Sequence, residues 1–189
     1  MAYHKKIVGE RCYLAPCTPE DAEAWTRWDN DLEVAIPMGE EAFMIFAEET
    51  EKAVLRDIAE KKLPIFNIVL NDGDRLIGRC MLFQVDQVNR AAMLGMVIGE
   101  KEYWSSGYGL EATRLLLDYA FNLLNLNSVM LGVYSFNKRA IRCYQKAGFK
   151  EIGVRRQARA FGSRVYDLIY MDMLASEFGA SVVDRILEQ

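Results

Sequence analysis

Three short apolar segments follow one another between residues 64 and 99, and a long helical pattern comes directly after them. The segments PIFNIVL, RLIGRCMLFQV and AAMLGMVIG are rich in Ile, Val, Leu and Phe, and the turn-forming stretches NDGD and DQVN separate them. This arrangement predicts an antiparallel meander. A helix expected at 108–124 leads to a strand at 128–134, and such a crossover predicts that the strands on either side of it run parallel.

Helices are expected before and after this core of strands. Thr18 is a good N-cap and Pro19 suits the first helical position, so TPEDAEAWTRWDND is predicted to begin a helix. Residues 40–62 show a second helical pattern, which Pro64 ends. A further helix is expected at 138–147, after the crossover.

The C-terminal part is predicted to contain a hairpin. Gly148 closes the preceding helix in the left-handed conformation. The segments FKEIGVRRQARA and RVYDLIYMDML flank the turn residues FGS, and a short helix follows. Residues 1–189 are therefore expected to form a single α/β domain, with a mixed, mostly antiparallel sheet covered by helices on both faces.

The overall composition excludes several classes of protein. Hydrophobic residues make up 51% and charged residues 26% of the chain, which is typical of a globular protein. No apolar run approaches the roughly 20 residues of a membrane-spanning helix, and the N-terminal sequence lacks an export signal, so we expect a cytoplasmic protein without a membrane partner. The net charge of −4 provides no basic field for nucleic acid.

Cysteine and histidine usage narrows the chemistry further. The four cysteines form no C-x-x-C pair, so buried free thiols are expected rather than a zinc or redox motif. The only histidine is His4, near the N-terminus. This position disfavours a Ser-His-Asp triad, a Cys-His pair or a His-ligated metal, and no metal site is predicted.

Gly107 and Gly109 stand at the start of the helix expected at 108–124. One side of this helix is expected to pack on the sheet, and the polar side is formed by Glu111, Arg114, Asp118 and Asn122. The unpaired amide groups from Ser106 to Leu110 would then point out of the loop, where the helix dipole adds partial positive charge. Because glycine has no side chain to hold an anion away, the loop predicts a pyrophosphate site. The alternative is that the glycines only permit a tight strand-to-helix turn.

Two segments of the sequence carry a family resemblance. VIGEKEYWSSGYGLEATRLLLDYAF, followed by VYSFNKRAIRCYQKAGF, resembles the GNAT superfamily of acetyl-CoA-dependent N-acyltransferases. The likeness is to the branch that includes the ribosomal-protein N-terminal-amine and spermidine acetyltransferases, and it is strong from about residue 65 to 173. The resemblance implies the GNAT fold, and it identifies the expected pyrophosphate as that of coenzyme A.

The resemblance also assigns roles to residues of the first segment. The family's [QR]-x-x-G-x-[GA] loop falls on residues 104–109, with Trp104 in the place of Gln or Arg. By resemblance, the residues that bind the cofactor here are Ser105, Ser106, Gly107, Tyr108, Gly109 and Leu110. The strand before the loop, 96–99, would part from its neighbour and bind the pantetheine through the backbone of Val97 and Gly99.

The second segment offers residues for the pantetheine arm and for the chemistry. Taken by themselves, Asn137 is an N-cap and Tyr144 a core aromatic residue. By resemblance, Asn137 also contacts the pantetheine, and the Tyr144 hydroxyl points at the thioester sulfur, where a phenol of pKa about 10 can protonate the leaving thiolate. Lys138, Arg139 and Arg142 form a basic edge, which is either a solvated helix face or a contact for the ribose 3′-phosphate.

The oxyanion donor and the base complete the expected machinery. The backbone N–H of Ile98 or Gly99 is the expected donor to the oxyanion. Relatives often have a glutamate in the pattern N-R-x-A-E-L-G, but this chain has NRAAMLG, with Met93 at that position. Water is therefore the favoured proton acceptor, and the acids considered in its place are Glu33, Glu40, Glu100 and Glu102.

The resulting prediction is an N-acetyltransferase that moves the acetyl group of acetyl-CoA to a primary amine, such as a protein or peptide N-terminus, a polyamine or another small amine. The acids that either favour a cationic amine or only form a charged surface are Asp29, Asp31, Glu33, Glu40 and Glu41. A non-catalytic acyl-CoA-binding sensor or assembly module is the alternative, which Met93 favours and Tyr144 opposes. A homodimer is common among relatives, and the sequence does not establish one here.

Overall fold

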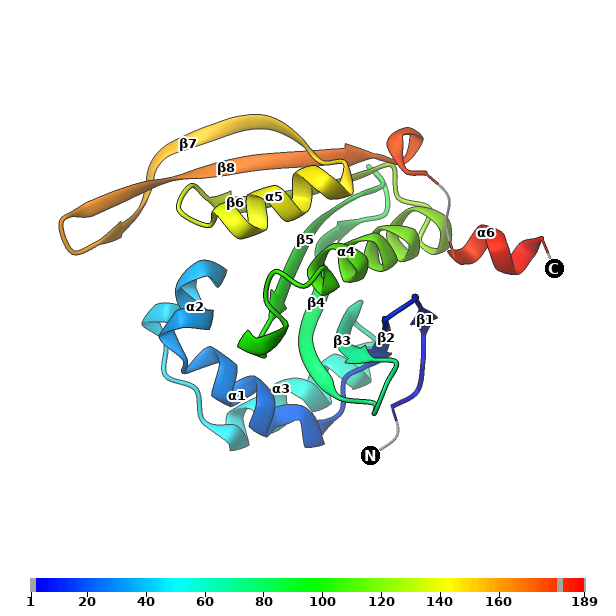
Figure 1. Cartoon of the computed structure of the whole chain (residues 1–189), viewed down its shortest axis with the longest axis horizontal. Coiled ribbons are helices and arrows are strands. Elements are labelled where there is room, and N and C mark those ends of the chain that lie inside the picture. Colours follow the sequence, from blue (N-terminus) through cyan, green and yellow to red (C-terminus); the bar gives the residue numbers. More distant parts are fainter. Residues whose placement is uncertain (1–2, 180–181, 189) are drawn as a thin grey trace. The chain divides into compact units, whose positions relative to one another are not determined.

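The computed structural model describes residues 3–179 and 182–188, and Figure 1 shows the helices and strands that these residues form. The strands are β1 (Ile7–Val8), β2 (Cys12–Pro16), β3 (Ile65–Leu70), β4 (Leu76–Asp86), β5 (Ala91–Ile98), β6 (Ser128–Tyr134), β7 (Lys150–Phe161) and β8 (Arg164–Leu174). The α-helices are α1 (Ala22–Asp29), α2 (Leu32–Met38), α3 (Glu48–Lys61), α4 (Tyr108–Asp118), α5 (Lys138–Ala147) and α6 (Val182–Leu187). No helix among these described residues is long and apolar enough to span a membrane.

The strands form one eight-stranded sheet in the order β1-β2-β3-β4-β5-β6-β8-β7. Antiparallel pairing joins β1 to β2, β2 to β3, β3 to β4, β6 to β8 and β8 to β7. The crossover through α4 makes β5 and β6 parallel. These pairings confirm the prediction of a mixed, mostly antiparallel sheet with helices around it.

The chain divides into two compact units. The first contains residues 1–81 and 96–112, and the second contains 82–95 and 113–189. The boundaries fall within β4 and β5 and within the first half of α4, so no linker separates the units in the sequence. The expectation of a single domain stays a prediction.

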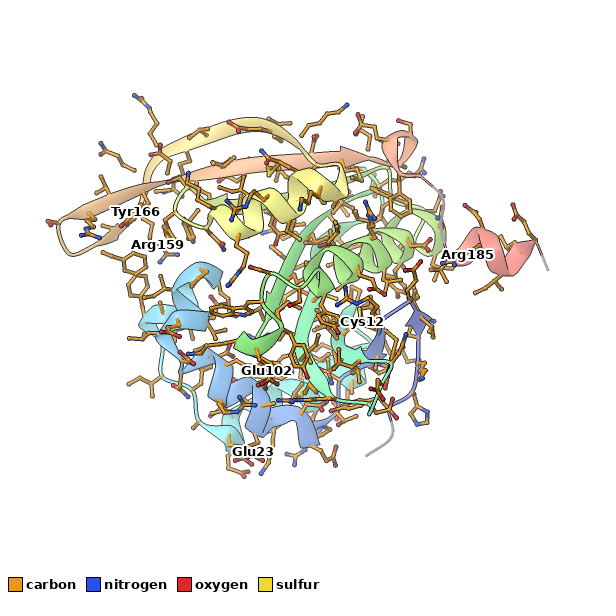
Figure 2. The ribbon with its side chains drawn as sticks, viewed as in Figure 1. Cys12, Glu23, Glu102, Arg159, Tyr166 and Arg185 are labelled. Atoms are coloured by element: carbon orange, nitrogen blue, oxygen red, sulfur yellow. The ribbon has the colours of Figure 1, made fainter. Side chains whose placement is uncertain are left out.

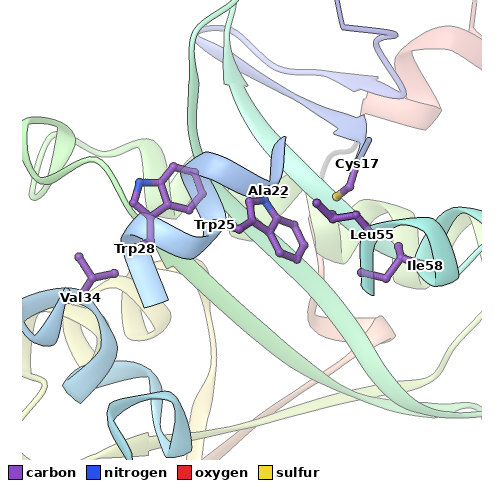
Figure 3. Close-up of a cluster of buried hydrophobic side chains, with 7 residues drawn as sticks. All are labelled: Cys17, Ala22, Trp25, Trp28, Val34, Leu55 and Ile58. Carbon is purple, nitrogen blue, oxygen red and sulfur yellow. The ribbon is translucent and has the colours of Figure 1, made fainter. Parts of the chain in front are cut away.

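Two tryptophans of α1 organise the core of the first unit. Trp25 and Trp28 are buried together with side chains of α2 and α3, including Val34 and Leu55 (Figure 3). Thr18 is the N-cap and Pro19 the first residue, as predicted, but of a 3₁₀ turn (Pro19–Asp21) that leads into α1; the Asp21 carboxylate accepts a hydrogen bond from the Thr18 backbone N–H at 2.7 Å. Burial of large apolar side chains at helical spacing therefore fixes α1 and α3 in this unit.

The helix predicted at 40–62 is shorter than expected. Residues 40–43 form a separate 3₁₀ turn, and α3 begins only at Glu48. Ile45 is 95% exposed, so the apolar residues before Glu48 do not continue the buried face of α3. The sequence pattern also did not indicate α2, β1 or β2.

The second unit contains β6, α5 and a long terminal hairpin. Figure 1 shows β7 and β8 as an extended two-stranded ribbon, as predicted from the segments around FGS. Gly148 ends α5 with φ 113°, which confirms the left-handed cap. Near the hairpin tip, Phe136 packs against Tyr134 and Tyr166, and Tyr166 and Arg159 are labelled there in Figure 2.

The expectation that Asp118 lies on the polar side of α4 is wrong. Asp118 is buried, and its carboxylate accepts hydrogen bonds from the backbone N–H groups of Val182 and Val183 and from the Asn122 side chain. The carboxylate therefore caps the N-terminus of α6, where an acid complements the free amides and the helix dipole. A carboxylate with such partners can be buried at the end of an otherwise apolar helix face.

Candidate functional site

The loop before α4 adopts an unusual backbone conformation. Ser105 has φ 60° and Gly107 has φ 92°, and both lie in the left-handed region. The first hydrogen bond of α4 runs from the Glu111 N–H to the Gly107 carbonyl, at 3.1 Å. Residues 105–107 are exposed, so the backbone of this loop is open to solvent.

The amide groups of this loop are free to bind an anion. Within the described part of the chain, the backbone N–H groups of Ser106, Gly107 and Tyr108 donate to no protein acceptor. Successive amides around a left-handed residue at a helix start form a concave anion site. The loop therefore fits the expected diphosphate in two respects: its donors are unpaired, and Gly107 has no side chain to cover them.

Trp104 braces the loop against the preceding strand. Its indole N–H donates to the Ile98 carbonyl at 2.6 Å, and its ring packs against the core of the first unit. A Gln or Arg at this position would present polar groups to a ligand, whereas the single N–H donor of this indole already bonds to the Ile98 carbonyl. The contribution of Trp104 is therefore to hold the loop close to the end of β5.

Two backbone N–H groups at the end of β5 are already hydrogen-bonded to β4. The N–H groups of Gly99 and Glu100 both donate to the Ile77 carbonyl, at 2.9 and 3.1 Å, so two residues oppose one and form a β-bulge. The expectation that the Gly99 N–H is an oxyanion donor is therefore wrong. Ile98 remains the predicted donor, and the Gly99 carbonyl is the group left to bind the pantetheine.

Gly99 is required because Trp28 packs directly on it. A Cβ at Gly99 would lie 2.1 Å from Cδ2 of the buried Trp28 ring. Overpacking of this kind typically costs about 1–3 kcal/mol. We therefore expect Gly99→Ala to lower the free energy of unfolding by that amount in urea titrations. The matched control is Gly153→Ala, which adds a methyl group in open space on β7; equal effects of the two changes would contradict the close contact.

Arg11 and Glu111 are two residues beside the loop that the sequence did not indicate as part of a site. The Arg11 guanidinium donates to the Ser106 carbonyl at 2.9 Å and lies 4.0 Å from the centre of the Tyr108 ring. The Glu111 carboxylate accepts hydrogen bonds from the backbone N–H groups of Arg11 and Cys12, at 2.8 and 3.3 Å; Cys12 is labelled in Figure 2. No local pattern links β2 with α4, because about a hundred residues separate them in the sequence.

The second unit holds the other predicted site residues. The Asn137 side chain accepts a hydrogen bond from the Ala140 N–H at 3.1 Å, which confirms it as the N-cap of α5. Tyr144 is buried, and its ring packs edge-on against Phe149. Arg142 is exposed on the same helix. The structure thus shows the loop residues in one unit and Asn137, Arg142 and Tyr144 in the other.

The parallel strands β5 and β6 separate early. Their ladder joins residues 91–93 to 128–130 and ends at Met93. Leu94 and Gly95 belong to the same unit and lie beyond the last pair. The opening expected at residues 96–99 concerns a part of β5 that belongs to the first unit, and it stays a prediction.

Glu100 is poorly suited to act as a base. Burial by itself would raise its pKa, but hydrogen bonds from Arg27 and Trp28 and the charges of Arg27 and Arg75 outweigh burial and hold the pKa below its usual value. The Arg27 pair has a distance of 2.6 Å. A carboxylate with a lowered pKa and several donors binds a proton weakly.

The other acids considered as bases also have cationic partners, where their side chains are described. Glu102 pairs with Arg75 at 2.6 Å, and Glu33 pairs with Lys101 at 2.5 Å. The side chain of Glu40 lies outside the described residues. These pairs leave water as the favoured proton acceptor.

Three of the five acids expected to attract a cationic amine are in ion pairs. Asp29 is buried and pairs with the buried Arg79 at 2.7 Å, so it does not belong to a charged surface. Asp31 caps α2 and pairs with Lys101 at 2.7 Å. Of the five predicted acids, Asp29, Asp31 and Glu33 are therefore already in ion pairs.

Glu51 on α3 gives the first unit a testable pH dependence. Burial raises the pKa of this buried carboxyl above its ordinary 4.5, the Asp29 charge raises it further, and Arg79 offsets only part of the change. Charged Glu51 therefore opposes folding once the pH exceeds the pKa of the unfolded chain. We expect Glu51→Gln to raise the Tm at pH 7.5 and the gain to vanish below about pH 4. Thermal unfolding of both proteins between about pH 4 and pH 7.5 measures this difference. An equal gain in Tm at the two pH values would contradict the role of the Glu51 charge.

The cysteine thiols are not placed for nucleophilic chemistry. All four are free, and Cys12, Cys17 and Cys80 are buried. Burial raises the pKa of the Cys12 thiol to about 12, and it raises the pKa of Cys17 and Cys80 as well. A thiol held protonated at neutral pH is a weak nucleophile. Within the described residues, no group of three or more His, Cys, Asp or Glu side chains could hold a metal ion.

Comparisons with known proteins agree with this arrangement. The family description "Acetyltransferase (GNAT) domain" matches residues 11–150. The chain is 28% identical over 171 residues to an uncharacterised N-acetyltransferase of Bacillus licheniformis, covering 89% of this chain and 96% of the relative. It is 30% identical over 142 residues to the spermidine N(1)-acetyltransferase of Escherichia coli K12, covering 74% and 73% of the two chains.

Solved structures show the same fold. The spermidine N-acetyltransferase of Vibrio cholerae, solved in complex with CoA and spermine, has a TM-score of 0.78 and 22% identity and covers 88% of this chain and 97% of its own. A probable acetyltransferase has a TM-score of 0.77 and 26% identity, with 92% and 98% covered. The family match spans most of the chain and includes both the glycine loop and Tyr144. The chain therefore belongs to the GNAT family of acyltransferases, enzymes that use acetyl-CoA.

Proposed function

We propose that this enzyme transfers the acetyl group of acetyl-CoA to a primary amine by direct attack in a ternary complex. The observation that carries the proposal is the loop before α4, where Ser105 and Gly107 have a left-handed backbone and the N–H groups of Ser106, Gly107 and Tyr108 donate to no protein acceptor in the described part of the chain. Relatives named as N-acetyltransferases support transfer to nitrogen.

The proposed cofactor contacts come from three segments of the chain. The loop residues Ser105, Ser106, Gly107, Tyr108, Gly109 and Leu110 bind the diphosphate through their backbone. The backbone carbonyls of Val97 and Gly99 accept hydrogen bonds from the pantetheine. By resemblance to the family, the Asn137 amide uses its remaining hydrogen-bonding capacity to bind the pantetheine, and the exposed Arg142 binds the 3′-phosphate.

Tyr144 is the proposed catalytic residue. Acetyl-CoA supplies the thioester whose carbonyl carbon forms the new bond to the amine nitrogen while the bond to sulfur breaks. The Tyr144 hydroxyl gives its proton to the departing sulfur, and the proton released by the amine goes to water. The ion pairs of Glu33, Glu100 and Glu102 support water in this role.

The acceptor is proposed as a primary amine without a strong requirement for several positive charges. The spermidine acetyltransferases among the relatives act on a polyamine. In this chain, Arg79 pairs with Asp29, and Lys101 is shared by Asp31 and Glu33, so only one net negative charge remains on this group to attract a polycation. A singly charged amine, such as a peptide N-terminus, is therefore the first acceptor to test.

The test of this function is thiol release from acetyl-CoA with a panel of acceptors. Short peptides with different N-terminal residues, spermidine and an aminoglycoside are compared at equal concentration, and mass spectrometry identifies the acetylated product. We expect stoichiometric thiol and acetyl-amine with at least one primary amine. Tight binding of acetyl-CoA without acetylation of any acceptor would contradict the proposal and favour a non-catalytic sensor.

A further inference from the structure

Arg11 is joined to the cofactor loop by its side chain and by its backbone. Nη1 of the guanidinium donates to the Ser106 carbonyl at 2.9 Å, and the guanidinium lies over the Tyr108 ring. The Arg11 backbone N–H donates to the Glu111 carboxylate at 2.8 Å. Its carbonyl accepts from the Asn71 N–H at 3.0 Å, so the position of Arg11 is fixed from β3 as well as from α4.

The hydrogen bond to Ser106 determines where the next amide points. The Ser106 carbonyl and the Gly107 N–H belong to one planar trans peptide unit, so they point in opposite directions. When Arg11 holds the carbonyl on its side of the loop, the Gly107 N–H must face the other side. In the described chain that N–H has no protein acceptor.

The same arrangement fixes the following amide. The Gly107 carbonyl accepts from the Glu111 N–H, so the Tyr108 N–H, on the same peptide unit, points away from the helix. Glu111 thus holds the Gly107 carbonyl with its backbone and holds Arg11 with its carboxylate. The two donors most directly available to a diphosphate are therefore both oriented by a network that includes Arg11.

Arg11 also strengthens the donor that it orients. A cation bonded to a carbonyl polarises the peptide unit, and the N–H at its other end becomes a better donor. The side chain itself lies on the opposite side of the peptide from the Gly107 N–H, so it acts through the backbone rather than by touching the ligand. Ser105 is a non-glycine residue at φ 60°, a conformation that persists only when neighbouring contacts hold it.

We propose that Arg11 is a positioning residue for acetyl-CoA, which orients the Gly107 amide toward the diphosphate. This inference rests on the proposed function of the loop. Arg11 acts on the diphosphate alone, so its loss weakens cofactor binding and leaves the chemical step intact. In steady-state kinetics, Arg11→Gln raises the KM for acetyl-CoA and leaves kcat unchanged at saturating cofactor.

The test compares three acyl donors by calorimetric titration: acetyl-CoA, acetyl-dephospho-CoA and S-acetylpantetheine, which lacks the diphosphate. For Arg11→Gln we expect about a tenfold or greater rise in Kd for the two donors that contain the diphosphate. The Kd of S-acetylpantetheine should not change. Arg11→Lys keeps a charged donor and should recover part of the loss, and Arg56→Gln, on the exposed side of α3, is the matched control.

The outcomes separate this inference from the proposed function. If the unaltered protein binds acetyl-CoA and Arg11→Gln binds it equally well, Arg11 has no positioning role. Equal losses for all three donors would show a general disturbance of the fold, and a loss confined to acetyl-CoA would place Arg11 at the 3′-phosphate; both results overturn the inference. Failure of the unaltered protein to bind acetyl-CoA would instead overturn the proposed function itself.

Discussion

Replacement of Tyr144 by phenylalanine is expected to lower kcat by about 100-fold or more, while the KM for acetyl-CoA changes little. Tyr144 is buried, and its ring packs edge-on against Phe149, a contact that phenylalanine preserves. The substitution removes only the hydroxyl group, which we propose as the proton donor to the leaving sulfur. General acid catalysis typically contributes about 10²–10⁴ in rate. Steady-state kinetics with a saturating amine measure the effect.

Tyr13→Phe is the matched control for this substitution. Tyr13 is also buried, and its hydroxyl bonds to Asp74 at 2.7 Å. Loss of that bond should lower the free energy of unfolding by about 1 kcal/mol and leave kcat unchanged. If Tyr144→Phe retained full kcat, the proton would have to reach the sulfur from water, and the proposed role of Tyr144 would be wrong.

The second large effect is expected at Gly107. Valine is β-branched and strongly disfavours the φ of 92° found there, so Gly107→Val should cost roughly 1–3 kcal/mol or force the loop into another conformation. Either result turns the Gly107 and Tyr108 amides away from the diphosphate. Loss of charge-assisted hydrogen bonds of this kind corresponds to a rise of about 100-fold in the Kd of acetyl-CoA, measured by calorimetry.

Gly73→Val separates backbone strain from the loss of the site. Gly73 has φ 74° in the turn between β3 and β4, and a Cβ there would meet no neighbouring atom. This variant should lose a similar amount of stability in urea titrations and bind acetyl-CoA normally. Equal affinities of the Gly73 and Gly107 variants for acetyl-CoA would contradict the role of the loop.

The regular parts of the fold were predictable because their hydrophobic patterns are strong and local. The meander, the crossover helix, α5 and the terminal hairpin follow from apolar segments bounded by turn residues or glycine. β2, Cys12–Pro16, is buried at four of its five positions and ends in proline, so it lacks the alternation that marks a half-buried strand. The helix predicted over residues 40–47 is wrong for the opposite reason. Apolar residues there suggest the buried face of a helix, but the structure leaves several of them exposed.

The part of the candidate site that the sequence predicts is the loop before α4, because its binding groups are backbone amides of one continuous segment. The conformation of the loop follows from Gly107 and from the start of α4, which are adjacent in the sequence. The roles of Arg11 and Trp28 depend on contacts between distant segments, which a single sequence does not reveal. For the same reason, the sequence leaves Glu100 as a candidate base, and only the structure shows its ionic partners Arg27 and Arg75.

A crystal structure of the protein with coenzyme A tests the central claim most directly. The account predicts diphosphate oxygens at hydrogen-bond distance, about 2.7–3.2 Å, from the backbone nitrogens of Gly107 and Tyr108, with the Ser106 carbonyl still bonded to Arg11. Coenzyme A bound elsewhere on the protein, with the loop of residues 105–110 making no contact with its phosphates, would contradict it.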